Sequence, residues 1–282
     1  MSYKTILVYV DQSPHAHARV ELASQLACSN EAHLVGAALT GITMALYRSS
    51  SVALGGSQPI PQTELDEITR GAAQALDRFE MQASAVGVSY ERRYSDDDPE
   101  MGLVQQARYA DLVVLSQTDP DTSGFGMVRK LPECLALNGG RPVLVVPHAG
   151  THTHLDRHAL VAWDGSRAAT RAITDALPLL RRSARVTLGI FNPGRQDAMH
   201  GEQPGADMAL YLARHGVKIE VLHQVTPPGL DVGNALLSLA ADSGADLLVM
   251  GAYGHLRWRE IILGGVTRRV LESMTLPVLM SH

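Results

Sequence analysis

The chain has 282 residues, enough for one large domain or two of ordinary size. Hydrophobic residues make up 45% of it and charged residues 19%, which is typical of a soluble globular protein with a substantial core. The formal net charge of −5 argues against a dedicated nucleic-acid-binding protein, which would carry a basic face.

The cysteine and hydropathy patterns indicate the cytoplasm. The two cysteines, Cys28 and Cys134, do not have a metal-binding spacing, as expected in a reducing compartment. The N-terminal segment MSYKTILVYVD has an apolar run too short for a secretory signal. No window approaches the ~18 apolar residues of a membrane span. We therefore expect a soluble cytoplasmic protein that binds neither membranes nor nucleic acid.

Apolar runs and helical periodicity alternate along the first half. Runs rich in β-branched residues predict strands, and 3.6-residue periodicity predicts helices. Strands are expected at 6–10, 34–38, 112–115 and 143–146, and helices at 14–28, 62–86, 98–109 and 129–138. The stretch 42–62 is interpreted as a surface loop, with a mobile lid over an apolar ligand or a partner as the alternative.

The second half repeats this pattern. Strands are expected near 159–163, 185–191, 217–222, 246–250 and 277–280, and helices near 166–181, 204–215, 231–243 and 264–274. Alternating elements with strands that are apolar on both faces predict right-handed βαβ crossovers and a parallel sheet. The expected fold class is α/β: two tandem doubly wound, Rossmann-like domains, each with a five-stranded parallel sheet flanked by helices.

The two halves align with one another. The stretch from Asp111 aligns without a gap with the stretch from Asp246, at an offset of 135 residues. Near the start of each half, TILVYVDQS resembles ALVAWDGS, which aligns Asp11 with Asp164. We therefore expect a tandem duplication, with domains at 1–148 and 158–282 joined by a linker at 149–157.

Four histidines in or beside the linker invite a metal interpretation: His148, His152, His154 and His158. No carboxylate or cysteine completes a convincing ligand set. We interpret the segment as a polar, flexible connection outside any core and expect no metal site.

Two segments of the second half stand where ligands bind in open parallel sheets, beyond the carboxyl ends of strands at a reversal of strand order. These are 164–166 after the first strand and 251–254 after the fourth, and residues 264–265 then begin the last helix. A helix N-terminus attracts anions, and glycine lets a phosphate approach the backbone. For Asp164, capping the next helix is as good an interpretation as binding a ligand.

The glycine spacing resembles the universal stress protein family. The stretch GAYGHLRWREIILGGVT, 251–267, carries three glycines in the pattern Gly-x2-Gly-x9-Gly-[Ser/Thr] of nucleotide-binding family members, ahead of a family-like ending, LPVLMSH. AWDGS at 162–166 is similar to the family's first strand and its aspartate. The GxGxxG and P-loop lysine motifs are absent. Because the resemblance covers both halves, the chain is identified as a tandem family member.

The resemblance implies ATP or ADP in the second domain, with or without Mg²⁺, and a role in stress response or signalling. The aspartate would contact adenosine, and the glycine loop would hold ribose and phosphates. The implied nucleotide-binding residues are Asp164, Gly165, Ser166, Ile190, Gly251, Gly254, Gly264, Gly265, Val266 and Thr267. Gly265 departs from the family's Ser or Thr and loses about 1 kcal/mol of hydrogen bonding, which Thr267 would partly compensate. No catalytic residue is expected, and any ATP hydrolysis should be slow.

The first half lacks the glycines. At the offset of 135, Ser116, Asp119, Arg129 and Lys130 replace Gly251, Gly254, Gly264 and Gly265. We therefore expect no nucleotide in the first domain, whose ligand stays unassigned. Since the first half keeps the length of the segment without its glycines, we interpret the glycines as serving a phosphate rather than the fold.

Other functions stay open. The chain could be an interaction or scaffold protein without nucleotide, with glycines that serve turns and helix packing, or its first domain could bind a different apolar or small ligand. An enzyme acting on an adenylated substrate rests on fold analogy alone. The resemblance also implies intramolecular pairing of Val143–Val146 with Val278–Met280, and it leaves a homodimer undecided.

Overall fold

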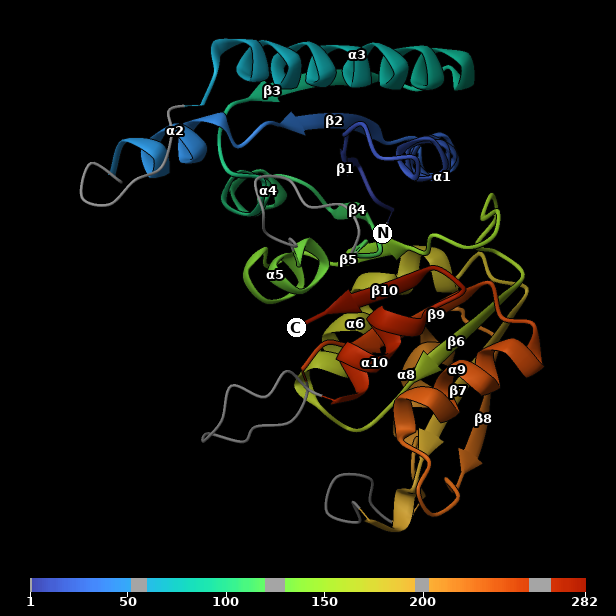
Figure 1. Cartoon of the computed structure of the whole chain (residues 1–282). Coiled ribbons are helices and arrows are strands. Elements are labelled where there is room, and N and C mark those ends of the chain that lie inside the picture. The colour runs from blue at the N-terminus through green and yellow to red at the C-terminus, as the bar shows by residue number, and fades with distance from the viewer. Residues whose placement is uncertain (1, 52–59, 120–129, 196–202, 254–264) are drawn as a thin grey trace. The chain divides into compact units, whose positions relative to one another are not determined.

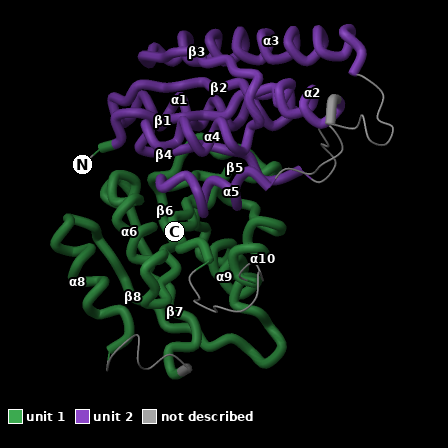
Figure 2. The backbone as a smooth tube through the Cα atoms, turned by 90° about the vertical axis from the view of Figure 1, so that its left-hand side faces the viewer, with its two compact units in different colours: residues 1–2, 142–282 green, residues 3–141 purple. Residues whose placement is uncertain are grey.

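Figure 1 shows a computed structural model of the chain, which describes residues 2–51, 60–119, 130–195, 203–253 and 265–282. Strands and helices alternate, so the predicted α/β class is confirmed. The chain divides into an N-terminal unit, residues 3–141, and a C-terminal unit, residues 142–282 with the first two residues (Figure 2). Within the described residues, no helix has the length and apolar character needed to cross a membrane.

The N-terminal unit contains a parallel sheet. Its strands are β1 (Thr5–Tyr9), β2 (His33–Leu39), β3 (Tyr90–Ser95) and β4 (Leu112–Ser116). Its helices are α1 (Ala16–Asn30), α2 (Ile42–Ser51), α3 (Gln62–Val86), α4 (Pro99–Ala107) and α5 (Leu131–Asn138). The strand order is β3-β2-β1-β4, and each neighbouring pair is parallel. Helix α1 packs against α3 and helix α4 against α5, so the helices flank the sheet in pairs.

The C-terminal unit contains a mostly parallel sheet. Its strands are β5 (Val143–Val146), β6 (His158–Ala162), β7 (Arg185–Phe191), β8 (Ile219–Gln224), β9 (Leu247–Gly251) and β10 (Val278–Ser281). Its helices are α6 (Arg167–Leu180), the short 3₁₀ helix η2 (Pro193–Arg195), α8 (Ala206–Arg214), α9 (Val232–Ser243) and α10 (Gly265–Ser273). The order is β5-β10-β9-β6-β7-β8, in which β6 to β10 are parallel.

Strand β5 runs antiparallel to β10, with Val143 opposite Met280 and Val145 opposite Val278. The predicted pairing of the last strands of the two repeats is therefore confirmed. Because β5 packs with β10, the boundary between the compact units falls at 141/142, ahead of the last strand of the first repeat. The predicted domains at 1–148 and 158–282 and the linker at 149–157 describe repeats of sequence rather than compact units. These boundaries stay a prediction.

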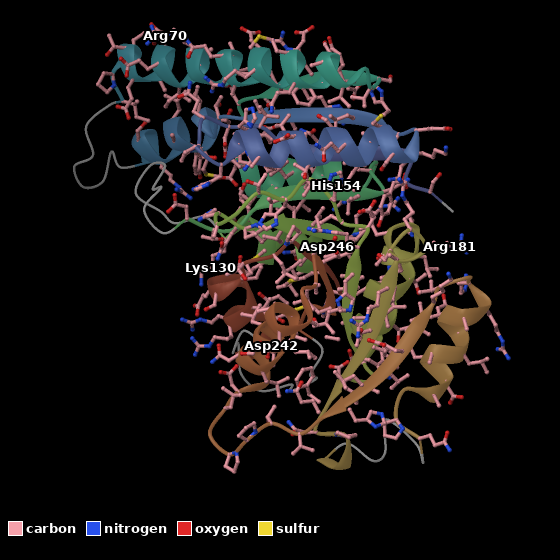
Figure 3. All side chains as sticks on the ribbon, turned by 90° about the vertical axis from the view of Figure 1, so that its right-hand side faces the viewer. Arg70, Lys130, His154, Arg181, Asp242 and Asp246 are labelled. Atoms are coloured by element: carbon pink, nitrogen blue, oxygen red, sulfur yellow. The ribbon has the colours of Figure 1, made fainter. Side chains whose placement is uncertain are left out.

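The likeness between the two halves extends to single side chains. Strands β1 and β6 match at an offset of 153 residues, and β4 and β9 match at 135. Asp111, just before β4, accepts hydrogen bonds from the amides of residues 4–5, at 2.7 and 3.0 Å. Asp246, just before β9 (Figure 3), accepts bonds of 2.9 Å from the amides of residues 157–158. Each aspartate thus satisfies backbone donors at the start of its repeat.

Some elements escape the sequence pattern. Strand β3 has no apolar run, because it lies at the edge of its sheet and alternates partly buried with exposed side chains. Helix α2 occupies the first part of the predicted surface loop 42–62, so that prediction is wrong for residues 42–51. The linker is not wholly outside the core, since Leu155 is buried and His158 begins β6.

Candidate functional site

The strand order of the C-terminal unit reverses between β6 and β9. From β6 the sheet continues to β7 and β8 on one side and to β9 and β10 on the other. Strands β6 and β9 are parallel neighbours, so their carboxyl ends lie at the same edge of the sheet. Residues 163–166 and 251–253 leave these two ends, and the structure therefore brings the two predicted site segments together at the point where such sheets bind ligands.

Asp164 and Ser166 form the turn that leads into α6. One carboxylate oxygen of Asp164, Oδ1, accepts a hydrogen bond of 2.9 Å from the Ser166 amide. Gly165 between them has φ +75°, a conformation that favours glycine. The buried Ser166 Oγ caps α6 by accepting a bond of 3.1 Å from the Ala169 amide. The helix cap is therefore Ser166, and the capping interpretation of Asp164 is wrong.

Because Ser166 caps the helix, Asp164 uses only one of its carboxylate oxygens, Oδ1, in this turn. Asp164 is partly exposed, and its Oδ2 has no hydrogen-bond partner among the described residues. A carboxylate oxygen is an acceptor, so it can receive a hydrogen bond from a hydroxyl or an N–H group of a ligand.

Gly251 packs against the start of α6. A Cβ at this position would lie 2.5 Å from the Ala169 nitrogen and 2.7 Å from the Ala168 carbonyl carbon. Both contacts are with backbone, which cannot move aside as a flexible side chain could. The interpretation that the fold does not require the glycines is therefore wrong for Gly251.

The start of the glycine loop is fastened to α10. The Tyr253 amide donates to Thr267 Oγ1 at 3.2 Å, and Thr267 is buried. Thr267 thus ties the backbone of residue 253 to α10 through its hydroxyl oxygen. Gly265 is exposed, and a Cβ built on it would meet nothing within 4 Å. Val266 beside it is partly buried, whereas Gly254 and Gly264 lie outside the described residues.

Ile190 lies away from ligand access. Its side chain is fully buried and points at Gly205, where an added Cβ would lie 2.4 Å from Ile190 Cδ1. The polar groups at this end of β7 are Asn192 and Thr226, which join the segments after β7 and β8. The Thr226 amide donates to Asn192 Oδ1 at 2.9 Å, and Asn192 Nδ2 donates to Thr226 Oγ1 at 3.0 Å. The sequence analysis did not identify this pair of hydrogen bonds. The signal that could have indicated it is an asparagine directly after a predicted strand.

The N-terminal unit fills the equivalent place with an arginine. Arg19 is buried, and its guanidinium bridges the ends of β1 and β4. It donates to the Tyr9 carbonyl at 2.7 Å, to Ser116 Oγ at 2.7 Å and to Asp11 Oδ1 at 2.9 Å. Asp11 and Ser116 are the counterparts of Asp164 and Gly251.

Arg19 compensates the charge of Asp11. Burial of the Asp11 carboxyl favours its neutral form, but the charge of Arg19 and hydrogen bonds from Ser13 and Arg19 outweigh burial and lower its pKa. At the offset of 153, Ala172 stands where Arg19 does, so α6 supplies no equivalent arginine to Asp164. The sequence analysis compared only the segments 116–130 and 251–265, so it did not find the difference between Arg19 and Ala172, which lie on α1 and α6.

The linker histidines do not converge. His152 Nε2 bonds to the Ala149 carbonyl oxygen at 2.8 Å, whereas the His158 ring lies among residues of the C-terminal sheet. No cluster of three or more His, Cys, Asp or Glu side chains suited to a metal ion is found within the described residues.

Comparison with known proteins gives sequence matches centred on one family. Residues 157–282 match the model of the Universal stress protein family. Universal stress protein Slr1230 of Synechocystis sp. is 38% identical over 71 residues, which are 24% of this chain and 22% of that protein. Universal stress protein MJ0577 of Methanocaldococcus jannaschii is 39% identical over 44 residues, 16% of this chain and 27% of that protein. The matches thus span only about a quarter of these relatives.

Solved structures match the fold over nearly the whole chain. A universal stress protein from Archaeoglobus fulgidus DSM 4304 has a TM-score of 0.70 at 18% identity, covering 98% of this chain and 94% of that chain. A functionally unknown protein from Pseudomonas aeruginosa PAO1 has a TM-score of 0.59 at 12% identity, with coverages of 98% and 92%. The family model thus matches the second half of the chain, residues 157–282, and these solved structures match the fold along both halves.

Proposed function

We propose that the C-terminal unit binds a nucleotide, ATP or ADP, and that the chain acts in stress response or signalling rather than as a fast catalyst. The observation that carries this proposal is the contrast between two equivalent aspartates. Asp11 is held by the buried guanidinium of Arg19, whereas among the described residues no cation pairs with Asp164 and one of its oxygens has no partner.

The geometry of Asp164 suits a nucleoside. A partly exposed carboxylate at the switch point of a parallel sheet can accept hydrogen bonds from ribose hydroxyls or from the amino group of a base. Gly165 and Ser166 hold this carboxylate through the turn, and Gly251 lets β9 approach α6 closely beside it. These residues support the nucleoside half of the site.

The phosphates would lie toward α10. The N-terminus of a helix attracts anions through its unpaired N–H groups and the helix dipole. Gly265 is exposed at the first described residue of α10, with free space where a side chain would begin. Any Mg²⁺ would arrive with the nucleotide, and hydrolysis would be slow because 251–267 contains no lysine.

An interaction protein without nucleotide is the second candidate. The observation that favours it is the packing of Gly251 on α6, which gives that glycine a purpose in the fold without any ligand. On this interpretation the surface of the domain, rather than a bound nucleotide, would select partners.

The proposal is tested by asking whether purified protein contains or responds to nucleotide. Heat-released extract would be separated by anion-exchange chromatography, and thermal unfolding would be followed with ATP, ADP and no nucleotide, each with and without Mg²⁺. We expect bound adenine nucleotide or a rise in the melting temperature at millimolar ATP. Absence of both would favour the interaction protein. The Asp164→Asn variant should lose the response.

Cellular context also stays a proposal. Both cysteines are free, Cys28 on the surface and Cys134 partly buried, which suits the reducing cytoplasm that we propose. A homodimer is an additional proposal from the family resemblance, to be tested by light scattering of the purified chain.

A further inference from the structure

Strand β3 lies at an open edge of the N-terminal sheet (Figure 1). Among the described residues its only strand partner is β2. The carbonyl oxygens of Ser89 and Ser95 accept hydrogen bonds of 2.8 and 3.0 Å from amides of β2 and of the residue after it. Backbone groups alternate in direction along a strand, so those of Tyr90, Arg92 and Tyr94 point to the open edge. A further strand can pair with such an edge.

The charges of β3 are complementary to those of an antiparallel copy of the same strand. In the sequence YERRY, residues 90–94, pairing Arg92 with its own copy sets Glu91 opposite Arg93 and Tyr90 opposite Tyr94. Glu91 and Arg93 form an ion pair within the strand, and their side chains are 42% and 40% exposed. On this face of the paired strands, each charge then has opposite charges as its neighbours both along and across the strands.

The same charges select one register. The backbone directions allow the copy to shift only in steps that keep outward-pointing residues opposite one another. The next register on one side sets Glu91 opposite Glu91, and the next on the other side sets Arg93 opposite Arg93. Like charges directly opposite are destabilising, so the register centred on Arg92 is favoured.

Helix α3 compensates the charge of Arg92 within each chain. The guanidinium donates to Glu80 at 2.7 Å and lies 2.9 Å from the Asp77 carboxylate. Tyr90 also donates to Glu80, at 2.8 Å. These side chains are thus bound to α3, and two copies of Arg92 can stand opposite one another with their charges already paired.

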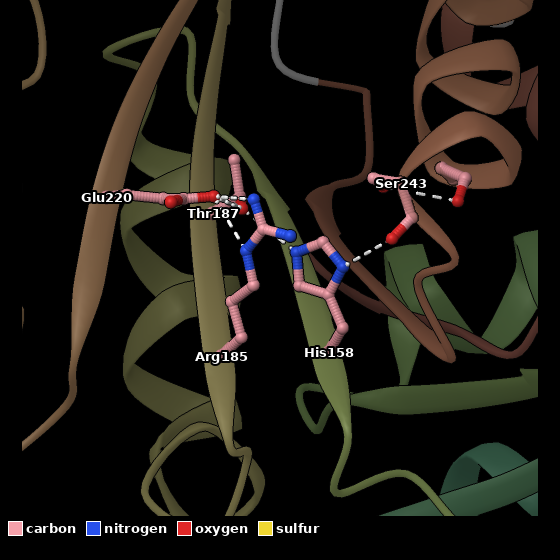
Figure 4. A network of polar contacts seen from close by, with 6 residues as sticks. His158, Arg185, Thr187, Glu220 and Ser243 are labelled. Carbon is pink, nitrogen blue, oxygen red and sulfur yellow. Dashed lines mark hydrogen bonds and ion pairs between the residues drawn. The ribbon is translucent and has the colours of Figure 1, made fainter.

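The edge strand of the C-terminal unit, β8, has no such complementarity. Its carboxylate, Glu220, is bound to β7, where Arg185 Nε and Thr187 Oγ1 donate to it at 2.9 and 2.7 Å (Figure 4). An antiparallel copy of β8 centred on Val221 would set Leu222 opposite this carboxylate. Self-pairing there would form no ion pair between the strands, so charge favours β3 over β8.

We propose that β3 pairs antiparallel with β3 of a second copy of this chain, which gives a two-fold dimer with one continuous sheet. Charged side chains on an edge strand ordinarily prevent pairing with other strands. On β3 they also select a partner, because the same strand of a second copy satisfies them. This interface is separate from the pairing of β5 with β10 inside one chain. It gives the proposed homodimer a location and does not rest on nucleotide binding.

The test measures dimerisation of the full-length chain by sedimentation velocity over a series of concentrations. We expect a dimer in the wild type. Glu91→Arg and Arg93→Glu each set like charges opposite one another at two symmetric places, so the dissociation constant should rise at least roughly tenfold. Arg214→Glu, an exposed position on α8, changes the net charge as Arg93→Glu does and should dimerise like the wild type.

Mixing the two β3 variants separates a lost interface from a damaged fold. An equimolar mixture of Glu91→Arg and Arg93→Glu chains again sets opposite charges across the strands, so the mixture should dimerise more tightly than either variant alone. Hydrogen–deuterium exchange adds a second measurement. The amides of Tyr90, Arg92 and Tyr94 should be protected in concentrated wild type and lose this protection on dilution.

Three results would overturn the proposal. A wild type that stays monomeric throughout the series would leave this edge to a strand of a different protein. Dimers of equal strength in the wild type and both single variants would place the homodimer on another surface, so that this interface fails while the homodimer stands. Folded variants whose mixture dimerises no better than each alone would show that Glu91 and Arg93 do not meet across the two strands.

Discussion

Gly251 lies against the first turn of α6, where a Cβ would stand 2.5 Å from the backbone nitrogen of Ala169. The end of β9 and the start of α6 come this close because residue 251 has no side chain. In the first repeat the counterpart is Ser116, whose hydroxyl accepts a hydrogen bond from Arg19. There α1 begins at Ala16, two residues later than α6 begins in equivalent numbering. The strand end and the following helix therefore pack directly on one another in the second repeat, whereas in the first repeat a serine at the strand end bonds to an arginine of the helix.

Gly251→Ser should destabilise the protein without any ligand. The added Cβ meets backbone atoms of α6, and overpacking of this kind costs about 1–3 kcal/mol. Urea denaturation followed by circular dichroism measures the change in the free energy of unfolding. Gly265→Ser is the matched control, since its Cβ meets nothing within 4 Å, and it should change stability by less than about 0.5 kcal/mol. Equal losses in the two variants would contradict the packing role of Gly251.

Arg19→Met should destabilise the N-terminal unit by about 3 kcal/mol. The substitution removes the buried cation that pairs with the Asp11 carboxylate and leaves that carboxylate without compensation. Hydrogen–deuterium exchange of β1 and β4 would locate the loss within the unit. Arg171→Met on α6 is the control, since Arg171 is an exposed partner of Asp175 and surface pairs contribute about 0–1 kcal/mol. If both variants behave alike, Arg19 does not hold the ends of these strands together.

Acid should weaken the N-terminal unit through Asp11. The pKa of its carboxyl lies below the usual value of 3.8 in the folded protein, so its contribution to stability is present above that value and lost as the pH falls below it. The midpoint of urea unfolding between pH 5 and pH 2 should fall less steeply in Asp11→Asn than in the wild type. Identical slopes would mean that Asp11 does not titrate in this window.

Gly265→Ser should strengthen nucleotide binding. The substitution supplies the hydroxyl that the family pattern has at this position, and the structure leaves space for it. One additional hydrogen bond of about 1 kcal/mol corresponds to roughly fivefold tighter ATP binding. Fluorescence titration with a labelled ATP analogue, competed by ATP, would measure the ratio. Unchanged or weaker binding would place the phosphates elsewhere.

The sequence predicted the fold well where apolar runs and repeats carry the information. The strands of the sheet interiors stand out because they are apolar on both faces, and the gapless offset of 135 residues places β4 and β9 in equivalent positions. Strand β3 was missed because edge strands carry polar side chains. Helix α2 was missed because Gly and Ser residues after it favoured a loop.

The candidate site was predictable in position but not in its contacts. Strand ends located residues 164–166 and 251–253, as the topology confirms. The sequence could not reveal that Ser166, rather than Asp164, caps α6, because both residue types cap helices equally well. Nor could it reveal that Arg19 reaches Asp11, since that contact depends on how α1 lies on the sheet.

Calorimetric titration of ATP into the wild type, Asp164→Asn and Asp11→Asn tests the central claim most directly. The account predicts one ATP per wild-type chain. Asp164→Asn should bind at least roughly tenfold more weakly, the effect of weakening a hydrogen bond to a charged group. Asp11→Asn, at the equivalent position of the other repeat, should bind like the wild type. No binding at millimolar ATP, or equal affinity in Asp164→Asn and the wild type, would contradict the account.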